Sequence, residues 1–250
     1  MTADPASARW LKRLTSPDGR GHQVLCFPHS GGAASAYRPL AAGLSGQLRV
    51  VAVQYPGRQD RVDEPVVTDL HELADRIAAV LDRTPLDGPC VFFGHSMGAI
   101  LAYEVAQRLG GSGPAALVAS ARPAPSRVRL TTNYLLDDAA FADGLVRLGG
   151  TAAAVLADPG LRALLLPMVR GDYQASETYR HRGDPPLRCP VVALAGDRDS
   201  TTTPQDVRAW SAHTAGSFRM ATLSGGHFYL NDHWPAVADV IRGTALEAGG

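Results

Sequence analysis

The chain has 250 residues, of which 45% are hydrophobic, and its 24 basic residues balance 24 acidic ones. A chain of this size can bury one sizeable core, so we expect a single domain over residues 1–250. The balanced charge, with no basic stripe interleaved with aromatics, argues against a nucleic-acid partner. No stretch approaches the roughly 18 apolar residues of a membrane span, and residues 1–14 lack a signal-peptide core, so we expect a cytoplasmic protein.

Six short apolar runs have the length and composition of strands. They are residues 24–27, 50–53, 91–93, 116–119, 191–195 and 220–223. Several are apolar at consecutive positions, which is typical of parallel strands covered by helices on both faces. The three cysteines, at positions 26, 90 and 189, lie in or beside these runs, and their odd number without paired spacing predicts reduced thiols.

Helical patterns alternate with these runs. Asp69 and Glu72 have capping-box spacing before a helix whose apolar residues from Leu70 to Leu81 recur on one face. A second helix is predicted over 99–109, and a last one has Pro235 in its first turn. The alternation of strand and helix predicts an α/β fold with a mostly parallel sheet flanked by helices.

One long segment interrupts this alternation. From about residue 122 to residue 187 there is no strand-like run, but amphipathic helical patterns occur over 135–148 and 161–169. We interpret the segment as a helical lid inserted over the carboxyl ends of the strands, where α/β proteins place their sites. The alternative is an ordinary pair of crossover helices lengthened by loops.

Residues 94–98 read Gly-His-Ser-Met-Gly between an apolar strand and a helix. This is the setting of a nucleophile elbow, in which a strained turn exposes a serine hydroxyl to a histidine base. Glycines at positions 94 and 98 keep side chains out of the tight turn. The sequence therefore predicts Ser96 as a catalytic nucleophile.

The acid and the histidine are expected downstream, in that order. Asp197 and Asp199 follow the run 191–195, and His227 lies in a glycine-rich loop after the last predicted strand. Asp199 has the longer reach toward a histidine, whereas an acid directly after a strand more often braces the turn. We predict the triad Ser96, Asp199 and His227, with Asp197 as the alternative acid.

The remaining histidines have structural interpretations. His181 and His213 lie in polar surroundings and are predicted at the surface, while His233 is a candidate supporting or packing residue. His95 adjoins the nucleophile but points elsewhere along the turn. His29 is expected to order its loop rather than to titrate.

An oxyanion hole needs two backbone N–H donors. Met97, directly after the nucleophile, is predicted to supply one. The second should come from the loop 27–32, which reads Phe-Pro-His-Ser-Gly-Gly after the first predicted strand. Ser30 is the predicted donor and Gly31 the alternative, while a plain glycine-rich turn is the non-functional interpretation.

Taken together, these motifs and one more segment resemble the type II thioesterases, the discrete editing enzymes of polyketide and nonribosomal peptide synthesis. The resemblance extends from about Val24 to the last helix, and its most discriminating piece is the segment 54–58. Ser30 departs from the family, which commonly has alanine there, and a backbone donor tolerates that exchange. The motifs are Phe-Pro-His-Ser-Gly-Gly at 27–32, Gln-Tyr-Pro-Gly-Arg at 54–58, Gly-His-Ser-Met-Gly at 94–98, Gly-Asp-Arg-Asp at 196–199 and Gly-Gly-His-Phe at 225–228.

The resemblance implies the α/β-hydrolase fold and hydrolysis of acyl groups from the phosphopantetheine thiol of acyl or peptidyl carrier proteins. It implies no metal and no dissociable cofactor, because the pantetheine belongs to the substrate, and we expect a monomer. Two alternatives stay open: a medium-chain acyl-carrier-protein thioesterase or small-ester carboxylesterase, and a non-catalytic ligand receptor on a hydrolase scaffold. The acyl preference, the synthase served and the docking surface are not encoded in these motifs.

Overall fold

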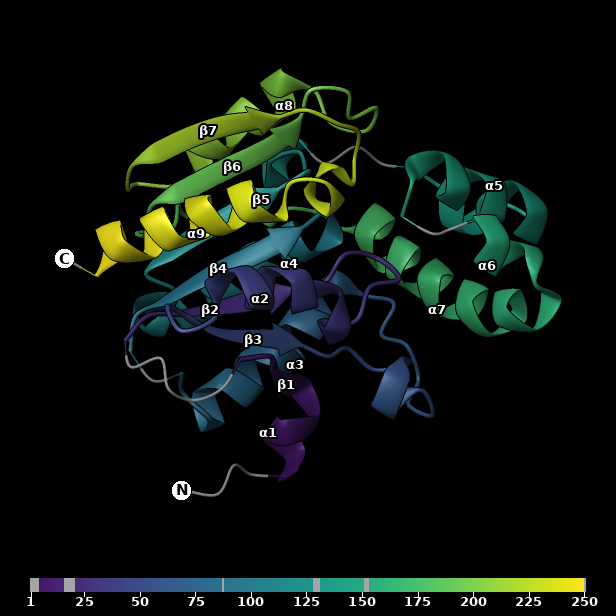
Figure 1. The fold of residues 1–250 in the computed structure, drawn as a ribbon, viewed down its shortest axis with the longest axis horizontal. Helices are drawn as coiled ribbons and strands as arrows, with labels where there is room; N and C mark the ends of the chain where they lie inside the picture. The colour runs from purple at the N-terminus through teal and green to yellow at the C-terminus, as the bar shows by residue number, and fades with distance from the viewer. Residues whose placement is uncertain (1–4, 16–20, 87, 128–130, 151–152, 250) are drawn as a thin grey trace.

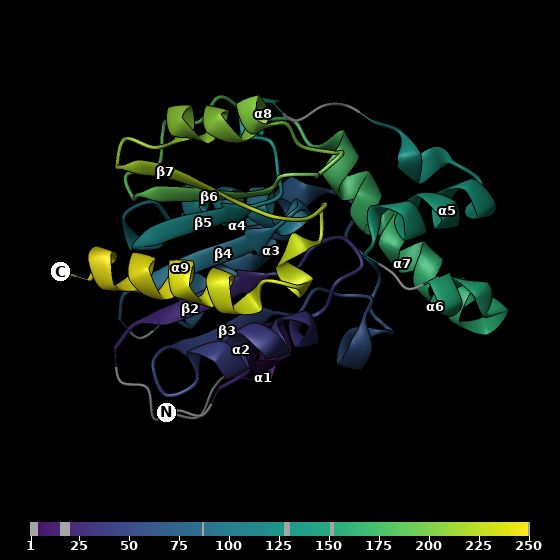
Figure 2. The same cartoon turned by 45° about the horizontal axis from the view of Figure 1, so that its top comes forward.

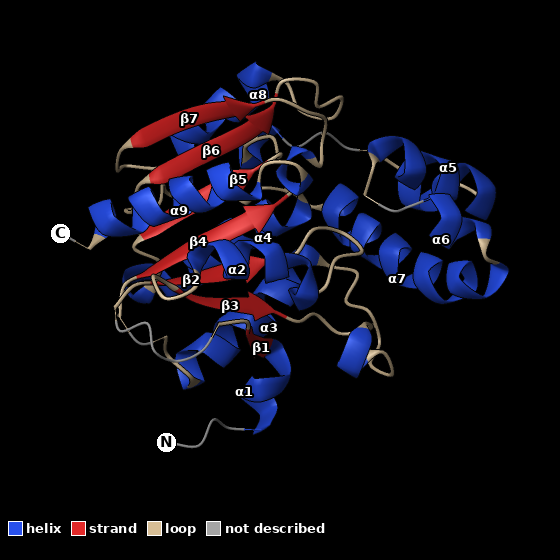
Figure 3. Ribbon diagram, in the orientation of Figure 1, coloured by secondary structure: helices blue, strands red, loops and turns tan. Residues whose placement is uncertain are grey.

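A seven-stranded, mostly parallel sheet forms the centre of the molecule (Figures 1 and 3). The computed structural model describes residues 5–15, 21–86, 88–127, 131–150 and 153–249. The strand order is β1-β3-β2-β4-β5-β6-β7, and β1 alone runs antiparallel, beside β3. The strands are β1 Leu11–Arg13, β2 Gln23–Phe27, β3 Arg49–Val53, β4 Cys90–His95, β5 Ala116–Ser120, β6 Val191–Gly196 and β7 Phe218–Leu223.

The six predicted strands are confirmed as β2 to β7, and the predicted α/β class with them. Strand β1 has no counterpart among the predictions. It is a three-residue edge strand that contains Lys12 and Arg13, so it leaves no apolar run in the sequence. Short and charged edge strands are a common protection against pairing with another chain.

Helices cover both faces of the sheet (Figures 1 and 2). Helices α3 and α4 pack on one face, and α2 and α9 on the other. The alternation of β2 shows both layers, because Leu25 and Phe27 belong to the first core cluster and Val24 and Cys26 to the second. The helices are α1 Pro5–Trp10, α2 Arg38–Leu44, α3 Leu70–Arg83, α4 Met97–Leu109, α5 Asp138–Leu148, α6 Ala153–Ala157, α7 Pro159–Thr178, α8 Pro204–Arg208 and α9 Trp234–Ala248.

The start of α3 shows a local difference from the prediction. Asp69 accepts a hydrogen bond from the backbone N–H of Glu72 at 2.8 Å, as an N-cap residue should. The Glu72 carboxylate, however, accepts from Arg76 one turn further on instead of reaching back to the cap. The predicted capping box is therefore only half formed, since an ion pair with a side chain competes for the same carboxylate.

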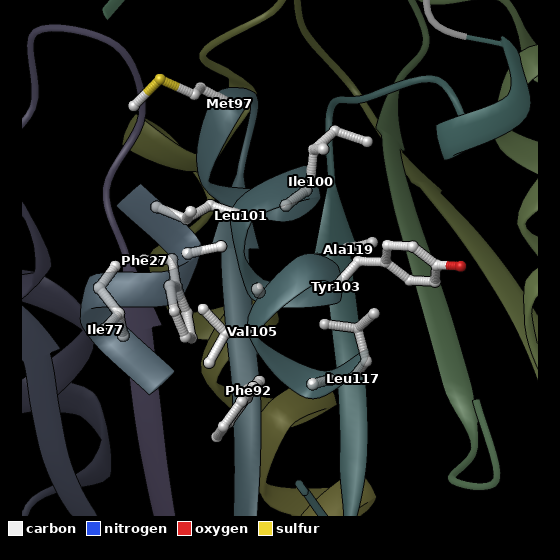
Figure 4. Close-up of a cluster of buried hydrophobic side chains, with 14 of the residues drawn as sticks. Phe27, Ile77, Phe92, Met97, Ile100, Leu101, Tyr103, Val105, Leu117 and Ala119 are labelled. Atoms are coloured by element: carbon white, nitrogen blue, oxygen red, sulfur yellow. The ribbon is translucent and has the colours of Figure 1, made fainter. Parts of the chain in front are cut away.

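Helix α4 is buried along nearly its whole length, which fixes the direction of the turn that precedes it. Figure 4 shows its side chains Ile100, Leu101 and Val105 above the strands, among aromatic and aliphatic residues of β4 and β5. Every residue of α4 from Met97 to Ala106 is buried. A helix this well held by the core can support a strained residue at its N-terminus.

Helices α5, α6 and α7 connect β5 to β6 and lie beyond the carboxyl ends of the strands (Figures 1 and 2). They occupy the segment 122–187 that the sequence predicts as an insertion, and α7 is longer than its predicted pattern. Pro167 lies inside α7. These helices have a small apolar cluster of their own, formed by Phe141, Ala142, Leu145, Leu156, Leu166, Met168 and Val169.

Among the described residues, no helix combines the length and apolar character needed to cross a bilayer. All three cysteines are free thiols, with Cys26 and Cys90 buried and Cys189 partly exposed.

Candidate active site

Ser96 occupies the turn between β4 and α4 with a backbone φ of 55° and ψ of −123°. This conformation is strained for any residue with a side chain. The core on both sides holds it in place: the Ser96 N–H donates to the carbonyl of Ser120 on β5 at 2.8 Å. Its side chain remains partly accessible at the N-terminus of a buried helix.

The two glycines of the pentapeptide are required by close backbone contacts. A Cβ at Gly94 would lie 2.1 Å from the carbonyl oxygen of Gly98, and a Cβ at Gly98 would lie 2.0 Å from that of Phe27. Neither contact is physically possible without moving the backbone of the turn. The prediction that these positions must lack side chains is confirmed.

The structure brings together the three side chains that the sequence predicts as a triad. His227 Nε2 lies 2.9 Å from the Oγ of Ser96, and its Nδ1 lies 2.9 Å from Oδ2 of Asp199. The side chains of His227 and Asp199 are 5% and 0% exposed. This arrangement requires a protonated Nδ1 facing the carboxylate, which leaves Nε2 as the acceptor for the serine proton.

Thr201 is a further member of this group that the sequence analysis does not single out. Its backbone N–H and hydroxyl both donate to Asp199 Oδ1 at 2.8 Å, and its Oγ1 lies 3.0 Å from His227 Nδ1. Burial raises the pKa of Asp199, but the bonds with His227 and Thr201 lower it more, so that it lies below the usual value. The sequence signal would have been an Asx turn, in which an aspartate bonds the backbone two residues on.

Asp197 has the turn-bracing role expected of the alternative acid. Its Oδ1 accepts from the backbone N–H of Gly225 at 2.7 Å, and it pairs with the exposed Arg198. Its side chain is exposed and makes no bond with His227. The geometry thus separates the two candidate acids, and Asp199 is the one that contacts the imidazole.

His95 and His29 stay neutral near the site. His95 is fully buried, with Nδ1 2.9 Å from the Ser120 hydroxyl, and burial holds its pKa well below the usual range. Burial, with the neighbouring His227 and Arg58, lowers the pKa of His29 to about 4. Neither ring can be a base of ordinary strength, which agrees with their expected structural roles.

The expectation that His213 lies at the surface is wrong. It is 5% exposed, its Nε2 lies 2.8 Å from the Ser126 hydroxyl, and burial lowers its pKa to about 4. His181 is partly exposed, and its ring lies 5.0 Å from that of His213. Packing among aromatic rings stabilises both, which polar neighbours in the sequence do not reveal. His233 donates to the Ser224 carbonyl at 2.8 Å, as a supporting residue would.

The loop that should carry the second oxyanion donor lies beside the nucleophile. The Ser30 hydroxyl contacts the Met97 sulfur at 3.5 Å, so the two predicted donor residues are neighbours. The Gly31 N–H is occupied, since it donates to Asp172 Oδ2 at 2.7 Å. Among the described residues, the Ser30 N–H has no acceptor. Because its N–H is already bonded, Gly31 is excluded as the second oxyanion donor, and Ser30 remains the candidate.

Arg58 and Asp172 form a contact near the site that the sequence does not reveal. Arg58 belongs to the Tyr-Pro-Gly-Arg segment, and Asp172 lies on α7. They form a buried two-point ion pair with distances of 2.7 and 2.8 Å. The family motif marks Arg58, but no local pattern marks a partner 114 residues away.

A cavity of about 320 Å³ lies over Ser96 and His227, between the sheet and the inserted helices. Its far wall is polar: the Glu177 carboxylate accepts from Thr131, Asn133 and the backbone of Tyr134. Burial lowers the pKa of Arg122 in the same wall to about 10. The lining residues are His29, Ser30, Ser96, Ala121, Arg122, Pro123, Thr131, Asn133, Leu148, Tyr173, Ser176, Glu177, Ser200, Thr201, His227 and Phe228.

Comparison with known proteins identifies the family to which the chain belongs. The model of the thioesterase domain family matches residues 22–244. The chain is 46% identical to a probable cadicidin biosynthesis thioesterase of Streptomyces griseus, covering 94% of this chain and 66% of that protein. It is 40% identical to the thioesterase PikA5 of Streptomyces venezuelae, over 98% of this chain and 88% of that protein.

Solved structures agree with these relatives. The type II thioesterase BorB from the borrelidin biosynthetic cluster superposes with a TM-score of 0.88 at 45% identity, over 98% of this chain and 99% of that one. YbtT, the type II thioesterase of the yersiniabactin pathway, has a TM-score of 0.86 at 28% identity, over 96% and 100% of the two chains. The chain therefore belongs to the thioesterase family, as a type II thioesterase of the α/β-hydrolase fold.

Proposed function

We propose that this protein hydrolyses acyl groups from the phosphopantetheine arm of acyl or peptidyl carrier proteins, and so frees synthases blocked by stalled or decarboxylated units. The observation that carries the proposal is the unbroken chain of contacts from Asp199 through His227 to Ser96, which ends in the cavity below the inserted helices. The substrate class is supported by two similar type II thioesterases, BorB of the borrelidin biosynthetic cluster and YbtT of the yersiniabactin NRPS/PKS pathway.

In the proposed first half-reaction, His227 Nε2 takes the proton of Ser96 as Oγ attacks the thioester carbonyl. The N–H groups of Met97 and Ser30 stabilise the negative oxygen of the tetrahedral intermediate. The positive imidazole that forms is stabilised by Asp199. Collapse of the intermediate breaks the carbon–sulfur bond, and the pantetheine thiol leaves with the proton held by His227.

The second half-reaction repeats these steps with water. His227 takes a proton from a water molecule, which attacks the acyl-serine, and the proton then returns to Oγ of Ser96. The products are a free carboxylic acid and an unloaded carrier. Side chains and water complete this reaction, so the proposed chemistry needs no dissociable cofactor.

The segment 122–187 is proposed to act as a lid over the cavity. Residues of α5 and α7 line part of the cavity, so a pantetheine arm would pass these helices to reach Ser96. Movement of such a segment would control access to the nucleophile. We propose that the protein acts as a monomer that meets its carrier protein at this side of the sheet.

The test compares turnover of acyl-carrier proteins, acyl-coenzyme A and nitrophenyl esters by the wild type and by Ser96→Ala. We expect the carrier substrates to have the highest kcat/KM and the variant to be folded but inactive. A preference for simple oxygen esters would contradict the proposal in favour of a carboxylesterase. Stable binding of acyl groups without turnover would contradict it in favour of a receptor.

A further inference from the structure

Two buried charges meet between the sheet and the inserted helices. Arg58 lies in the loop after β3, Asp172 lies on α7, and their side chains are 3% and 1% exposed. Nη1 and Nη2 of Arg58 donate to the two carboxylate oxygens of Asp172 at 2.7 and 2.8 Å. This is the planar two-point geometry that a guanidinium forms and an ammonium cannot.

Both members of the pair also hold the loop beside the nucleophile. Asp172 Oδ2 accepts from the Gly31 N–H at 2.7 Å, and Arg58 Nη1 donates to the Gly32 carbonyl at 3.0 Å. The turn is closed by the Gly32 N–H, which donates to the His29 carbonyl at 2.8 Å. The peptide groups that follow the predicted oxyanion donor, Ser30, are therefore fixed by bonds to two other parts of the chain.

The loop also touches α7 directly. Gly31 has a left-handed φ of 78°, and a Cβ there would lie 3.0 Å from Cγ2 of Val169, one turn before Asp172. The glycine lets the loop approach the helix closely. The position of the loop 29–32 therefore depends on the position of α7.

Stability alone is a weak explanation for this pair. Removing two charges from water costs several kcal/mol per ion, and well-packed apolar residues of similar volume are often as stabilising. What apolar residues cannot do is accept from the Gly31 N–H and donate to the Gly32 carbonyl at once. The pair is suited to orienting backbone groups, which an oxyanion hole requires within a fraction of an ångström.

We infer that Arg58 and Asp172 are positioning residues for the oxyanion hole, which hold the Ser30 N–H in its donor position and make that position depend on helix α7. The inference rests on the proposed function, in that it concerns the hydrolytic step at Ser96. It assigns a role to the Tyr-Pro-Gly-Arg segment, and it means that a displaced α7 would leave the hole unformed.

The test uses the nearly isosteric variant Asp172→Asn, together with Arg58→Lys, which keeps the charge, and Arg58→Met, which removes it. The control is Glu64→Gln, which weakens a similar two-point ion pair with the buried Arg61 in the same loop. That pair makes no bond with residues 29–32. Melting temperature, kcat and KM on an acyl-carrier protein, and the rate of inactivation by an alkyl fluorophosphonate are measured for each protein.

We expect kcat to fall about 10²-fold in Asp172→Asn and in Arg58→Met, since misplacement of about 1 Å costs that much. KM should change little, and Arg58→Lys should retain part of the activity. The fluorophosphonate rate should fall with kcat, because phosphonylation of Ser96 needs the same N–H donors. Glu64→Gln should keep the wild-type kcat and fluorophosphonate rate, because its ion pair does not contact the loop 29–32.

The inference is overturned if Asp172→Asn folds and keeps kcat and the fluorophosphonate rate within about threefold of the wild type, a range that a 10²-fold effect exceeds. Equal losses in Glu64→Gln would also overturn it, since they would show a general effect of stability. Failure of the proposed function looks different: the wild type would then react with the fluorophosphonate but leave acyl-carrier proteins intact. The fluorophosphonate comparison among variants would still decide the inference.

Discussion

Replacing Asp199 by asparagine tests the assignment of the triad acid, with Asp197→Asn as its matched control. The carboxylate accepts from His227 Nδ1 at 2.9 Å and from Thr201 at 2.8 Å. An asparagine can keep the bonds from Thr201, but its amide N–H₂ cannot accept from the imidazole. The ring is then free to present a protonated Nε2 to Ser96, which is the wrong tautomer for a base.

The expected loss can be graded from these contacts. A triad Asp→Asn change in a serine protease lowers kcat about 10⁴-fold, which corresponds to about 5.5 kcal/mol of barrier. Here Thr201 Oγ1 lies 3.0 Å from Nδ1 and can still accept its proton. We therefore expect a loss of about 10³- to 10⁴-fold in kcat for Asp199→Asn, and about tenfold more when Thr201→Val is added.

Asp197→Asn should keep kcat within about threefold, because the amide oxygen can still accept from the Gly225 N–H. The assay is single-turnover release of the free acid from an acyl-carrier protein at about pH 7.5. Circular dichroism checks that both variants are folded under the same conditions. A larger loss in Asp197→Asn than in Asp199→Asn would refute the assignment. So would an Asp199→Asn enzyme within tenfold of the wild type.

Three further predictions concern other parts of the molecule. Ser30→Ala should change kcat/KM by less than about threefold, since its expected contribution is a backbone N–H; a large loss in the same assay would indicate a hydroxyl role. Gly98→Ala should cost about 3 kcal/mol or more in urea unfolding, because its Cβ would lie 2.0 Å from the Phe27 carbonyl oxygen, and a stable variant would contradict that contact. Burial lowers the pKa of His213 to about 4 from 6.5, so the unfolded chain binds the proton first as pH falls. Stability is then lost from about pH 6.5 down to pH 4, by about 2 kcal/mol between pH 7 and pH 5, and His213→Gln should reduce that slope in urea titrations.

Local patterns in the sequence were enough to predict the framework of the fold and the triad. Buried parallel strands must be apolar at consecutive positions, so six of the seven were readable as short runs between turns. The elbow was readable for a similar local reason, because a strained serine between a strand and a helix needs small residues on either side. The order of Ser96, Asp199 and His227 followed from the order of strands, whose carboxyl ends meet at one edge of the sheet.

The direction of side chains and their contacts with distant residues could be seen only in the folded chain. Asp197 and Asp199 lie two residues apart in one turn, and only the path of the backbone aims one at Gly225 and the other at His227. The sequence leaves Gly31 open as an alternative to Ser30, and only the folded chain shows that a carboxylate from α7 occupies the Gly31 N–H.

Local patterns also failed to predict three other features. These are the burial of His213, the short edge strand β1 and the pairing of Arg58 with Asp172. Hydrophobic periodicity predicts which face of a helix or strand is apolar, and this signal extends over only one such element. It does not record which polar groups meet across the folded chain. Burying a charge or an N–H without a hydrogen-bond partner costs free energy. The buried polar groups therefore pair with groups that can lie far away in the sequence.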